Sequence, residues 1–253
     1  MITQNRNITQ HYLEDNKGSI YIKCYKADII DAPTVILSHG LSLNHTFMIS
    51  YAKKLQKMKI NAIVFDFHGG GYDTLSSGRI EDMSLLTEID DLNNVIDYVK
   101  TWDFINPDKL YLAGHSQGGF ISSIVADRRC DINAIFLFAP AYVILDDVRN
   151  TKNMRPKNVL TLMDELGDKY INDAKKIKLP DDIRGYTGDV LIFHGKLDER
   201  VPIKYAYEAF NTYNDDNCEL IIFDDEEHRF TDKTKDIVVE KIKEKIDMIL
   251  NIK

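Results

Sequence analysis

The sequence predicts an α/β protein in which a mostly parallel, doubly wound sheet carries helices on both faces. Two observations lead to this fold class. Short runs of almost wholly apolar residues, rich in β-branched side chains, recur along the chain, and strands buried on both faces have this composition. The segments between these runs instead have the apolar spacing of amphipathic helices. Regular alternation of the two patterns is typical of parallel sheets with crossover helices.

The apolar runs locate the strands, and the periodic segments locate the helices. Strands are expected at residues 20–25, 34–38, 61–66, 110–113, 134–138, 190–193 and 220–223. One helix face is formed by Leu85, Ile89, Leu92, Ile96 and Val99, which follow one another at steps of three or four residues. A second such face, near the C-terminus, is formed by Val238, Ile242, Ile246 and Ile249.

One segment, at roughly residues 141–187, breaks the alternation because it is longer than a single crossover helix requires. It contains Pro156, a helical stretch through Met163 and Leu166, and then Tyr170. We interpret it as a small cap inserted over the carboxyl edge of the sheet, where α/β proteins bind ligands. Residues 1–253 are then expected to form a single domain with this cap, since α/β domains of this size are common.

Composition and charge narrow the classes of partner and compartment. The net charge of −8, from 32 basic and 40 acidic residues, disfavours nucleic acid and anionic membranes as partners. Three widely spaced cysteines, Cys24, Cys130 and Cys218, do not suggest a disulfide framework or a zinc site. Because residues 1–10 are polar and no long apolar run follows, we expect a cytoplasmic protein.

A candidate nucleophile, Ser116, lies in the run Gly114-His115-Ser116-Gln117-Gly118, which matches Gly-x-Ser-x-Gly. The pattern alone is weak, because an ordinary glycine-rich turn can produce it. Here a predicted strand precedes it and a helix-like run follows it, as a nucleophile elbow requires. Such a turn presents the serine hydroxyl in a strained backbone conformation, and the following helix start favours developing negative charge.

A serine hydroxyl needs a base, and His228 is the one histidine that follows the last predicted strand. The orienting acid should follow the strand at 190–193, which selects Asp198 in His194-Gly195-Lys196-Leu197-Asp198. Its competitors by loop position are Glu199, Asp224 and Asp225, which we rank lower.

The oxyanion of the transition state needs two N–H donors. We expect them to be the backbone N–H of Gln117, directly after the nucleophile, and that of Leu41, in the loop after the strand at 34–38. The run Gly69-Gly70-Gly71 lacks the lysine and spacing of a phosphate-binding loop, so we interpret it as a close-packed turn. No metal-ligand spacing is evident, and no cofactor is expected.

Together these stretches resemble the α/β-hydrolase superfamily across nearly the whole chain. Within it the chain is similar to bacterial cinnamoyl (feruloyl) esterases that carry a small inserted cap. The narrower resemblance rests on Gly-His-Ser-Gln-Gly-Gly at 114–119, Ala-Pro-Ala at 139–141 and the Gly-x-x-Tyr that ends at Tyr170. In that group a cap aspartate and a cap tyrosine bind the substrate's phenolic hydroxyl, and these roles carry over by position to Asp147 and Tyr170. One alternative is that Asp146, rather than Asp147, has the binding role. Another is that the two aspartates are simply solvated and that Tyr170 only packs within the cap.

The resemblance implies a carboxylic ester hydrolase that forms an acyl-serine intermediate and acts on hydroxycinnamates or other small aryl or acyl esters. Alternatives with the same triad are a monoacylglycerol lipase, a thioesterase or a peptidase, and a further one is a non-catalytic binding module. The cap contains several lysines, which make an apolar pocket for a long acyl chain less natural: Lys152, Lys157, Lys169, Lys175 and Lys176. Peptidases of this fold usually carry a further domain, for which we expect no room. The expected partner is a small-molecule ester, and we expect no nucleic acid or membrane partner. The sequence does not decide whether the protein forms a homodimer.

Overall fold

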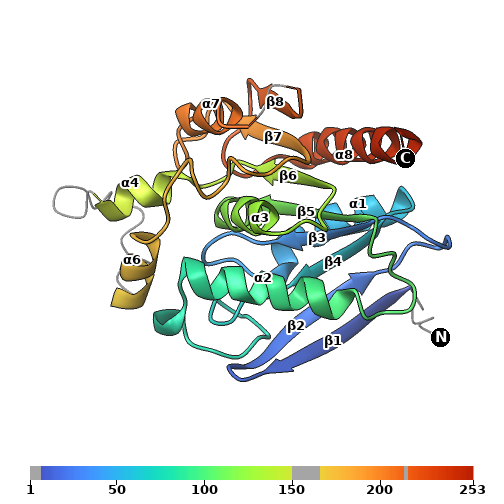
Figure 1. Cartoon of the computed structure of the whole chain (residues 1–253), viewed down its shortest axis with the longest axis horizontal. Coiled ribbons are helices and arrows are strands. Elements are labelled where there is room, and N and C mark those ends of the chain that lie inside the picture. The colour runs from blue at the N-terminus through green and yellow to red at the C-terminus, as the bar shows by residue number, and fades with distance from the viewer. Residues whose placement is uncertain (1–6, 150–165, 214–215, 253) are drawn as a thin grey trace.

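A single eight-stranded sheet in the order β1-β2-β4-β3-β5-β6-β7-β8 forms the centre of the molecule (Figure 1). The structure is a computed structural model, and it describes residues 7–149, 166–213 and 216–252. The strands are β1 Ile8–Asp15, β2 Gly18–Tyr25, β3 Thr34–Ser38, β4 Asn61–Phe65, β5 Leu110–His115, β6 Ala134–Phe138, β7 Asp189–Gly195 and β8 Cys218–Phe223. All pairs from β4 to β8 are parallel, whereas β1 and β2 join antiparallel. The predicted mostly parallel α/β sheet is therefore confirmed.

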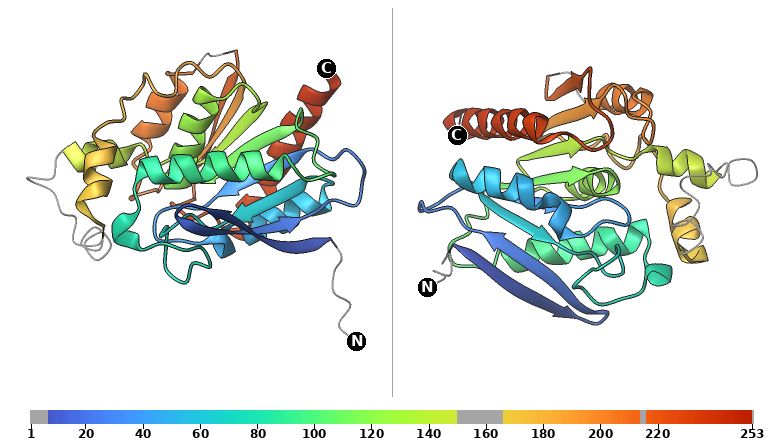
Figure 2. Two further views of the ribbon diagram at one scale, coloured as in Figure 1. Left: turned by 60° about the horizontal axis from the view of Figure 1, so that its bottom comes forward. Right: turned by 180° about the vertical axis from the view of Figure 1, so that it is seen from behind.

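Helices cover both faces of the sheet (Figure 2). They are α1 Ile49–Lys57, α2 Leu85–Val99, α3 Gln117–Arg128, α4 Val143–Arg149, α6 Asp168–Ala174, α7 Lys204–Phe210 and α8 Asp232–Ile252, with short 3₁₀ turns η1 His45–Met48 and η2 Ile80–Asp82. On one face, α2 and α3 pack on strand residues such as Leu112 and Ile135. On the other, α1 and α8 pack on their chain neighbours Tyr111 and Phe136. Successive side chains of a strand point to opposite faces, so each buried strand supplies two separate cores.

The strand β1 was not predicted from the sequence. Its side chains alternate between half-buried and exposed, and β2 is its one neighbour in the sheet. A half-solvated edge strand needs no continuous apolar run, and the sequence of residues 8–15 has none. The expectation of a fully covered sheet therefore overlooked this strand.

The helices α4 and α6 lie between β6 and β7 in the chain and beyond the carboxyl ends of the strands (Figure 1). Leu166 is buried there, just before α6, and Tyr170 lies within that helix. The predicted helical stretch through Met163, together with Pro156, Lys152 and Lys157, lies outside the described residues. Among the helices of the ranges that the structure describes, none is both long and apolar enough to cross a membrane.

A buried carboxylate, Asp66, holds the loops at the carboxyl ends of β3 and β4 together. It accepts hydrogen bonds from the backbone N–H of His45 at 2.5 Å, from the His45 ring Nδ1 at 2.9 Å and from the N–H of Leu75 at 2.8 Å. Burial alone raises the pKa of the Asp66 carboxyl, but these donors outweigh it and hold the pKa below its ordinary value. Asp66 is therefore an ionised anchor for the loops that lead to the site.

We expect Asp66→Asn to lower the free energy of unfolding by about 2–3 kcal/mol, because hydrogen bonds to a buried charge are lost. A depressed folded pKa gives stability that is present above the ordinary pKa of 3.8 and is lost as pH falls. The deficit should therefore be largest near neutrality and shrink below that value in urea denaturation. The exposed Asp73→Asn is the matched control, and equal curves for the two variants would contradict this role.

Candidate active site

Ser116 occupies the turn between β5 and α3 in a backbone conformation that non-glycine residues rarely adopt, with φ 56° and ψ −120°. Three hydrogen bonds hold the turn in place. Its N–H donates to the carbonyl of Phe138 at 2.9 Å, while its own carbonyl accepts from Ala141 at 3.0 Å and Phe120 at 3.1 Å. The end of β6 and the first turn of α3 thus stabilise a strained residue, as is common for catalytic groups.

Two glycines let this turn pack directly against its neighbours. A Cβ atom on Gly118 would lie 2.4 Å from the carbonyl oxygens of Ser38 and His39, and one on Gly114 would lie 2.3 Å from the Gly118 carbonyl. The end of β3 therefore meets the turn backbone to backbone. The same contact brings the next loop to the nucleophile, since a Cβ on Gly40 would lie 3.0 Å from that of Ser116.

The structure brings the three predicted triad residues together from three separate loops. His228 Nε2 lies 3.0 Å from Ser116 Oγ, and His228 Nδ1 lies 2.7 Å from Asp198 Oδ2. The second carboxylate oxygen, Oδ1, accepts the backbone N–H groups of Arg200 and Val201, both at 2.9 Å. Because a carboxylate accepts hydrogen bonds, Nδ1 of the neutral ring carries the proton and Nε2 presents its lone pair to the serine hydroxyl.

The competing acids lie elsewhere. Glu199, Asp224 and Asp225 are exposed, and Asp224 forms an ion pair with Lys196 at 2.8 Å.

A functional residue that sequence reasoning missed is His115, directly before the nucleophile. Its Nε2 lies 2.9 Å from the carbonyl oxygen of His228, which makes this nitrogen the donor. Complete burial, and next the charge that His228 would carry, hold the pKa of His115 well below its ordinary value. The His115 imidazole therefore fixes the backbone of the candidate base through this hydrogen bond, and its lowered pKa favours the neutral ring. The position of His115 directly before the nucleophile was visible in the sequence, but its partner 113 residues away was not.

The two predicted oxyanion donors border the nucleophile. Gln117 is the first residue of α3, and N–H groups at a helix start have no partner within the helix. Leu41 directly follows Gly40, the residue packed against Ser116. The buried His39 shapes this loop, since its Nδ1 donates to the Gly40 carbonyl at 2.9 Å while Nε2 accepts the Phe67 N–H at 3.3 Å. Burial lowers the pKa of His39, which favours the neutral ring that this pairing needs.

The side chain of Gln117 belongs to a buried polar chain that the sequence did not reveal. Its amide Nε2 donates to Glu88 Oε2 at 2.7 Å, and its Oε1 accepts the Tyr170 hydroxyl at 2.5 Å. Burial raises the pKa of Glu88 well above its ordinary range, and the hydrogen bond from Gln117 opposes this weakly. Glu88 on α2, Gln117 at the start of α3 and Tyr170 on α6 are thereby connected.

The residues predicted to bind a phenol lie in different surroundings. Asp147 is exposed, yet partial desolvation, and next the charge of Asp146, raises the pKa of its carboxyl. Asp146 instead accepts a hydrogen bond from the Tyr205 hydroxyl at 2.7 Å. Burial, and next the charges of Glu88 and Asp147, raise the pKa of the Tyr170 hydroxyl, which donates its hydrogen bond to Gln117.

A cavity of about 590 Å³ opens beside the triad. Its lining combines charged and apolar side chains, namely Lys196, Leu197, Asp198, Glu199, Arg200, Glu227 and His228. A space of this volume accommodates a small organic molecule, and it borders the acid and the histidine of the triad.

The parallel sheet order, the strained serine between a strand and a helix, and the acid–histidine–serine chain define an α/β hydrolase. Within this class the chain belongs to the prolyl oligopeptidase family, whose model matches residues 49–247.

The chain is also similar to several other proteins and solved structures. The uncharacterised protein YfhR of Escherichia coli K12 is 28% identical over 227 residues, which cover 86% of this chain and 70% of YfhR. The human protein ABHD12B is 29% identical, over 83% of this chain and 59% of its own length. The solved structure of Est1E from Butyrivibrio proteoclasticus with bound ferulic acid superimposes with a TM-score of 0.83 at 26% identity, over 95% of this chain and 99% of Est1E.

Replacing Asp198 with Asn should lower kcat by about 10³–10⁴-fold, because an amide no longer fixes the histidine tautomer or stabilises the imidazolium. KM should change little, since both oxygens of the Asp198 carboxylate are already bonded, to His228 and to the N–H groups of Arg200 and Val201. Steady-state hydrolysis of p-nitrophenyl acetate measures both constants. Asp224→Asn, an exposed neighbour on the other loop, is the matched control, and comparable losses in the two variants would refute the assignment of Asp198.

Replacing Glu88 with Gln should preserve turnover and raise stability at alkaline pH. A raised folded pKa means that the stability present below the ordinary pKa of 4.5 is lost progressively as pH rises, because the unfolded carboxyl ionises first. The amide avoids this cost, so its advantage in urea denaturation should be larger at about pH 8 than at about pH 4. Glu88→Leu, which strands the Gln117 amide, should instead lose both stability and kcat. A Gln variant that is as impaired as the Leu variant would show that the charge is needed.

Proposed function

We propose that this protein is a carboxylic ester hydrolase that acts through an acyl-serine intermediate on Ser116. One observation carries the proposal: the unbroken chain from Asp198 through His228 to Ser116, with separations of 2.7 and 3.0 Å. These distances are within the range required for proton transfer between a nucleophile and its base. A non-catalytic binding module would be favoured if a triad member were missing, but all three residues are present here.

In the proposed mechanism each group has its own role. Ser116 Oγ attacks the ester carbonyl carbon while His228 Nε2 accepts its proton, and Asp198 stabilises the resulting imidazolium. The N–H groups of Leu41 and Gln117 bind the oxyanion of the tetrahedral intermediate. His228 then returns the proton to the leaving alcohol as the C–O bond breaks. Water, activated by the same histidine, attacks the acyl-serine and releases the acid.

For the substrate we propose small aryl-acyl esters of the hydroxycinnamate type. The structural similarity to Est1E with bound ferulic acid, at 26% identity, supports this class. In this proposal Tyr170 and Asp147 bind the phenolic hydroxyl of the acyl group. The two roles of Tyr170 are compatible, because a tyrosine oxygen that donates to Gln117 can still accept a hydrogen bond.

A peptide substrate is the second candidate, because the family model that matches most of the chain is that of the prolyl oligopeptidases. The same triad would cleave an amide by the same steps. A long-chain lipid ester is less well supported, since α6 and the residues just after it present Lys169, Lys175 and Lys176.

A fluorophosphonate probe tests the nucleophile, and we expect it to label the wild-type protein at Ser116. Ser116→Ala should abolish the label and reduce hydrolysis of p-nitrophenyl acetate by at least about 10³-fold. Ser122→Ala, which changes another buried serine on α3, should leave the label in place. Absence of a label in the folded wild-type protein, or unchanged turnover in Ser116→Ala, would overturn the proposal.

A panel of methyl ferulate, p-nitrophenyl butyrate, a monoacylglycerol and a prolyl p-nitroanilide tests the substrate class. We expect the highest kcat/KM on methyl ferulate and a loss in Tyr170→Phe that is about tenfold greater on this ester than on the butyrate. Asp147→Asn should show the same selectivity, with Asp146→Asn as its matched control. Equal losses on all esters would assign Tyr170 to the support of Gln117 alone, and a preference for the anilide would select the peptidase.

A further inference from the structure

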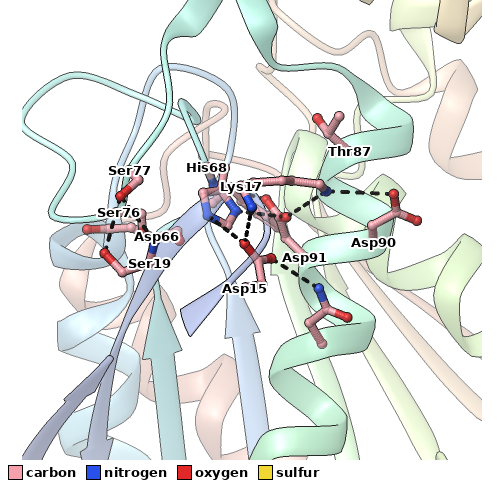
Figure 3. A network of polar contacts seen from close by, with 12 residues as sticks. Asp15, Lys17, Ser19, Asp66, His68, Ser76, Ser77, Thr87, Asp90 and Asp91 are labelled. Atoms are coloured by element: carbon pink, nitrogen blue, oxygen red, sulfur yellow. Dashed lines mark hydrogen bonds and ion pairs between the residues drawn. The ribbon is translucent and has the colours of Figure 1, made fainter. Parts of the chain in front are cut away.

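A second cluster of titratable side chains lies at the β1–β2 end of the sheet, on elements that do not carry the triad (Figure 3). Asp15 ends β1, His68 follows β4, and Asp91 lies on α2. One coordinating atom from each of the three lies within 4.8 Å of the others. The proposed ester hydrolysis uses none of them.

Asp91 fixes the orientation of the His68 imidazole. The carboxylate is fully buried, and it accepts the His68 backbone N–H at 2.9 Å and the ring Nδ1 at 3.0 Å. Nδ1 is therefore the protonated nitrogen of a neutral ring, and Nε2 carries the lone pair. A carboxylate bonded to one ring nitrogen while the other points to an ion is the usual arrangement of metal-binding histidines.

The Nε2 atom is buried and lacks a hydrogen-bond partner among the described residues, in a side chain that is 6% exposed. It faces Asp15 Oδ1 at 3.6 Å. Two acceptors that face each other need a cation between them, and the candidates are a proton and a metal ion. The gap exceeds an N–H···O hydrogen bond, whereas an ion about 2.0–2.2 Å from each atom would bridge it at an angle of roughly 120°.

Asp15 is held in the same way as His68. Its Oδ1 accepts the backbone N–H of Lys17 at 2.7 Å, and its Oδ2 accepts the side-chain amide of Asn94 at 3.4 Å. The carboxylate lies near the rim, with 14% of its side chain exposed, so solvent can deliver an ion and fill the remaining positions.

We propose that His68 Nε2 and the Asp15 carboxylate bind a divalent transition-metal ion of the zinc class, with Asp91 orienting the imidazole. Imidazole nitrogen together with carboxylate oxygen suits zinc better than magnesium or calcium, which prefer oxygen alone. The ion would join the β1–β2 hairpin to the loop after β4. That loop begins at Asp66, so the site would stabilise the same region that Asp66 anchors.

The ammonium group of Lys17 limits the affinity. Its Nζ lies 3.4 Å from Asp91 Oδ1 and 3.7 Å from Asp90 Oδ2, beside the gap rather than within it. A cation so close repels a metal ion, but the side chain is 33% exposed and can turn towards solvent. Two substitutions should therefore act in opposite directions: removal of Asp15 weakens binding, and removal of Lys17 strengthens it.

Zinc titration of the EDTA-treated, full-length protein tests the site, in a Cys130→Ser background because this thiol is exposed. We expect one zinc ion per chain with a dissociation constant on the order of micromolar, and a higher Tm with zinc. Asp15→Asn should weaken binding by at least about tenfold, Lys17→Gln should tighten it about threefold or more, and Asp90→Asn should leave it unchanged. Cobalt should give the visible absorption of a nitrogen- and oxygen-ligated ion, which Asp15→Asn removes.

Failure to bind zinc at about 100-fold above the expected constant would overturn the site. So would binding that Asp15→Asn leaves intact. His68→Gln is a further variant with an expected loss of binding, and if it fails to fold, the two rim positions Asp15 and Lys17 still decide the outcome. A histidine NMR signal showing that His68 carries protons on both nitrogens, unaltered by zinc, would assign the gap to a proton instead.

Discussion

The site depends on a backbone contact in which no side chain intervenes. Gly118 at the start of α3 touches the carbonyls of Ser38 and His39 at the end of β3. This contact holds the nucleophile turn against the loop that carries Leu41, one of the two residues whose N–H groups we propose as oxyanion donors. The strained conformation of Ser116 persists because β6 and α3 supply hydrogen bonds that an unstrained turn would lose.

Burial by itself does not decide whether a carboxyl group in this protein is charged. Asp66 and Glu88 are both almost completely buried, yet their pKa values shift in opposite directions. Asp66 receives two backbone N–H groups and an imidazole, whereas Glu88 accepts its hydrogen bond from the side-chain amide of Gln117. The number of hydrogen-bond donors therefore explains the opposite pKa shifts. Several donors stabilise the ionised form of Asp66, whereas the amide at Glu88 does not outweigh the effect of burial.

Much of this arrangement could be predicted from the sequence. The buried parallel strands have continuous apolar runs, and the order of serine, acid and histidine along the chain sufficed to select three residues that the structure brings together. What was missed depends on contacts across the fold. His115 finds the backbone of His228, and Glu88 finds Gln117, without any spacing that links them. Asp15, His68 and Asp91 likewise come from three elements, so the search for metal-ligand spacing in the chain could not find them.

The cavity beside the triad has a consequence for how such an enzyme can diversify. The contacts that hold Ser116 are backbone to backbone and admit no larger side chain, so this part of the molecule tolerates little change. The cavity wall is different, because Lys196, Glu199 and Glu227 present exposed side chains there, even though the backbone of two of these loops meets at Gly195. Mutations at these positions can therefore change what the pocket binds without altering the contacts that hold Ser116. In this fold the residues that hold the nucleophile are thus different from the residues that line the pocket, so the two groups can change independently.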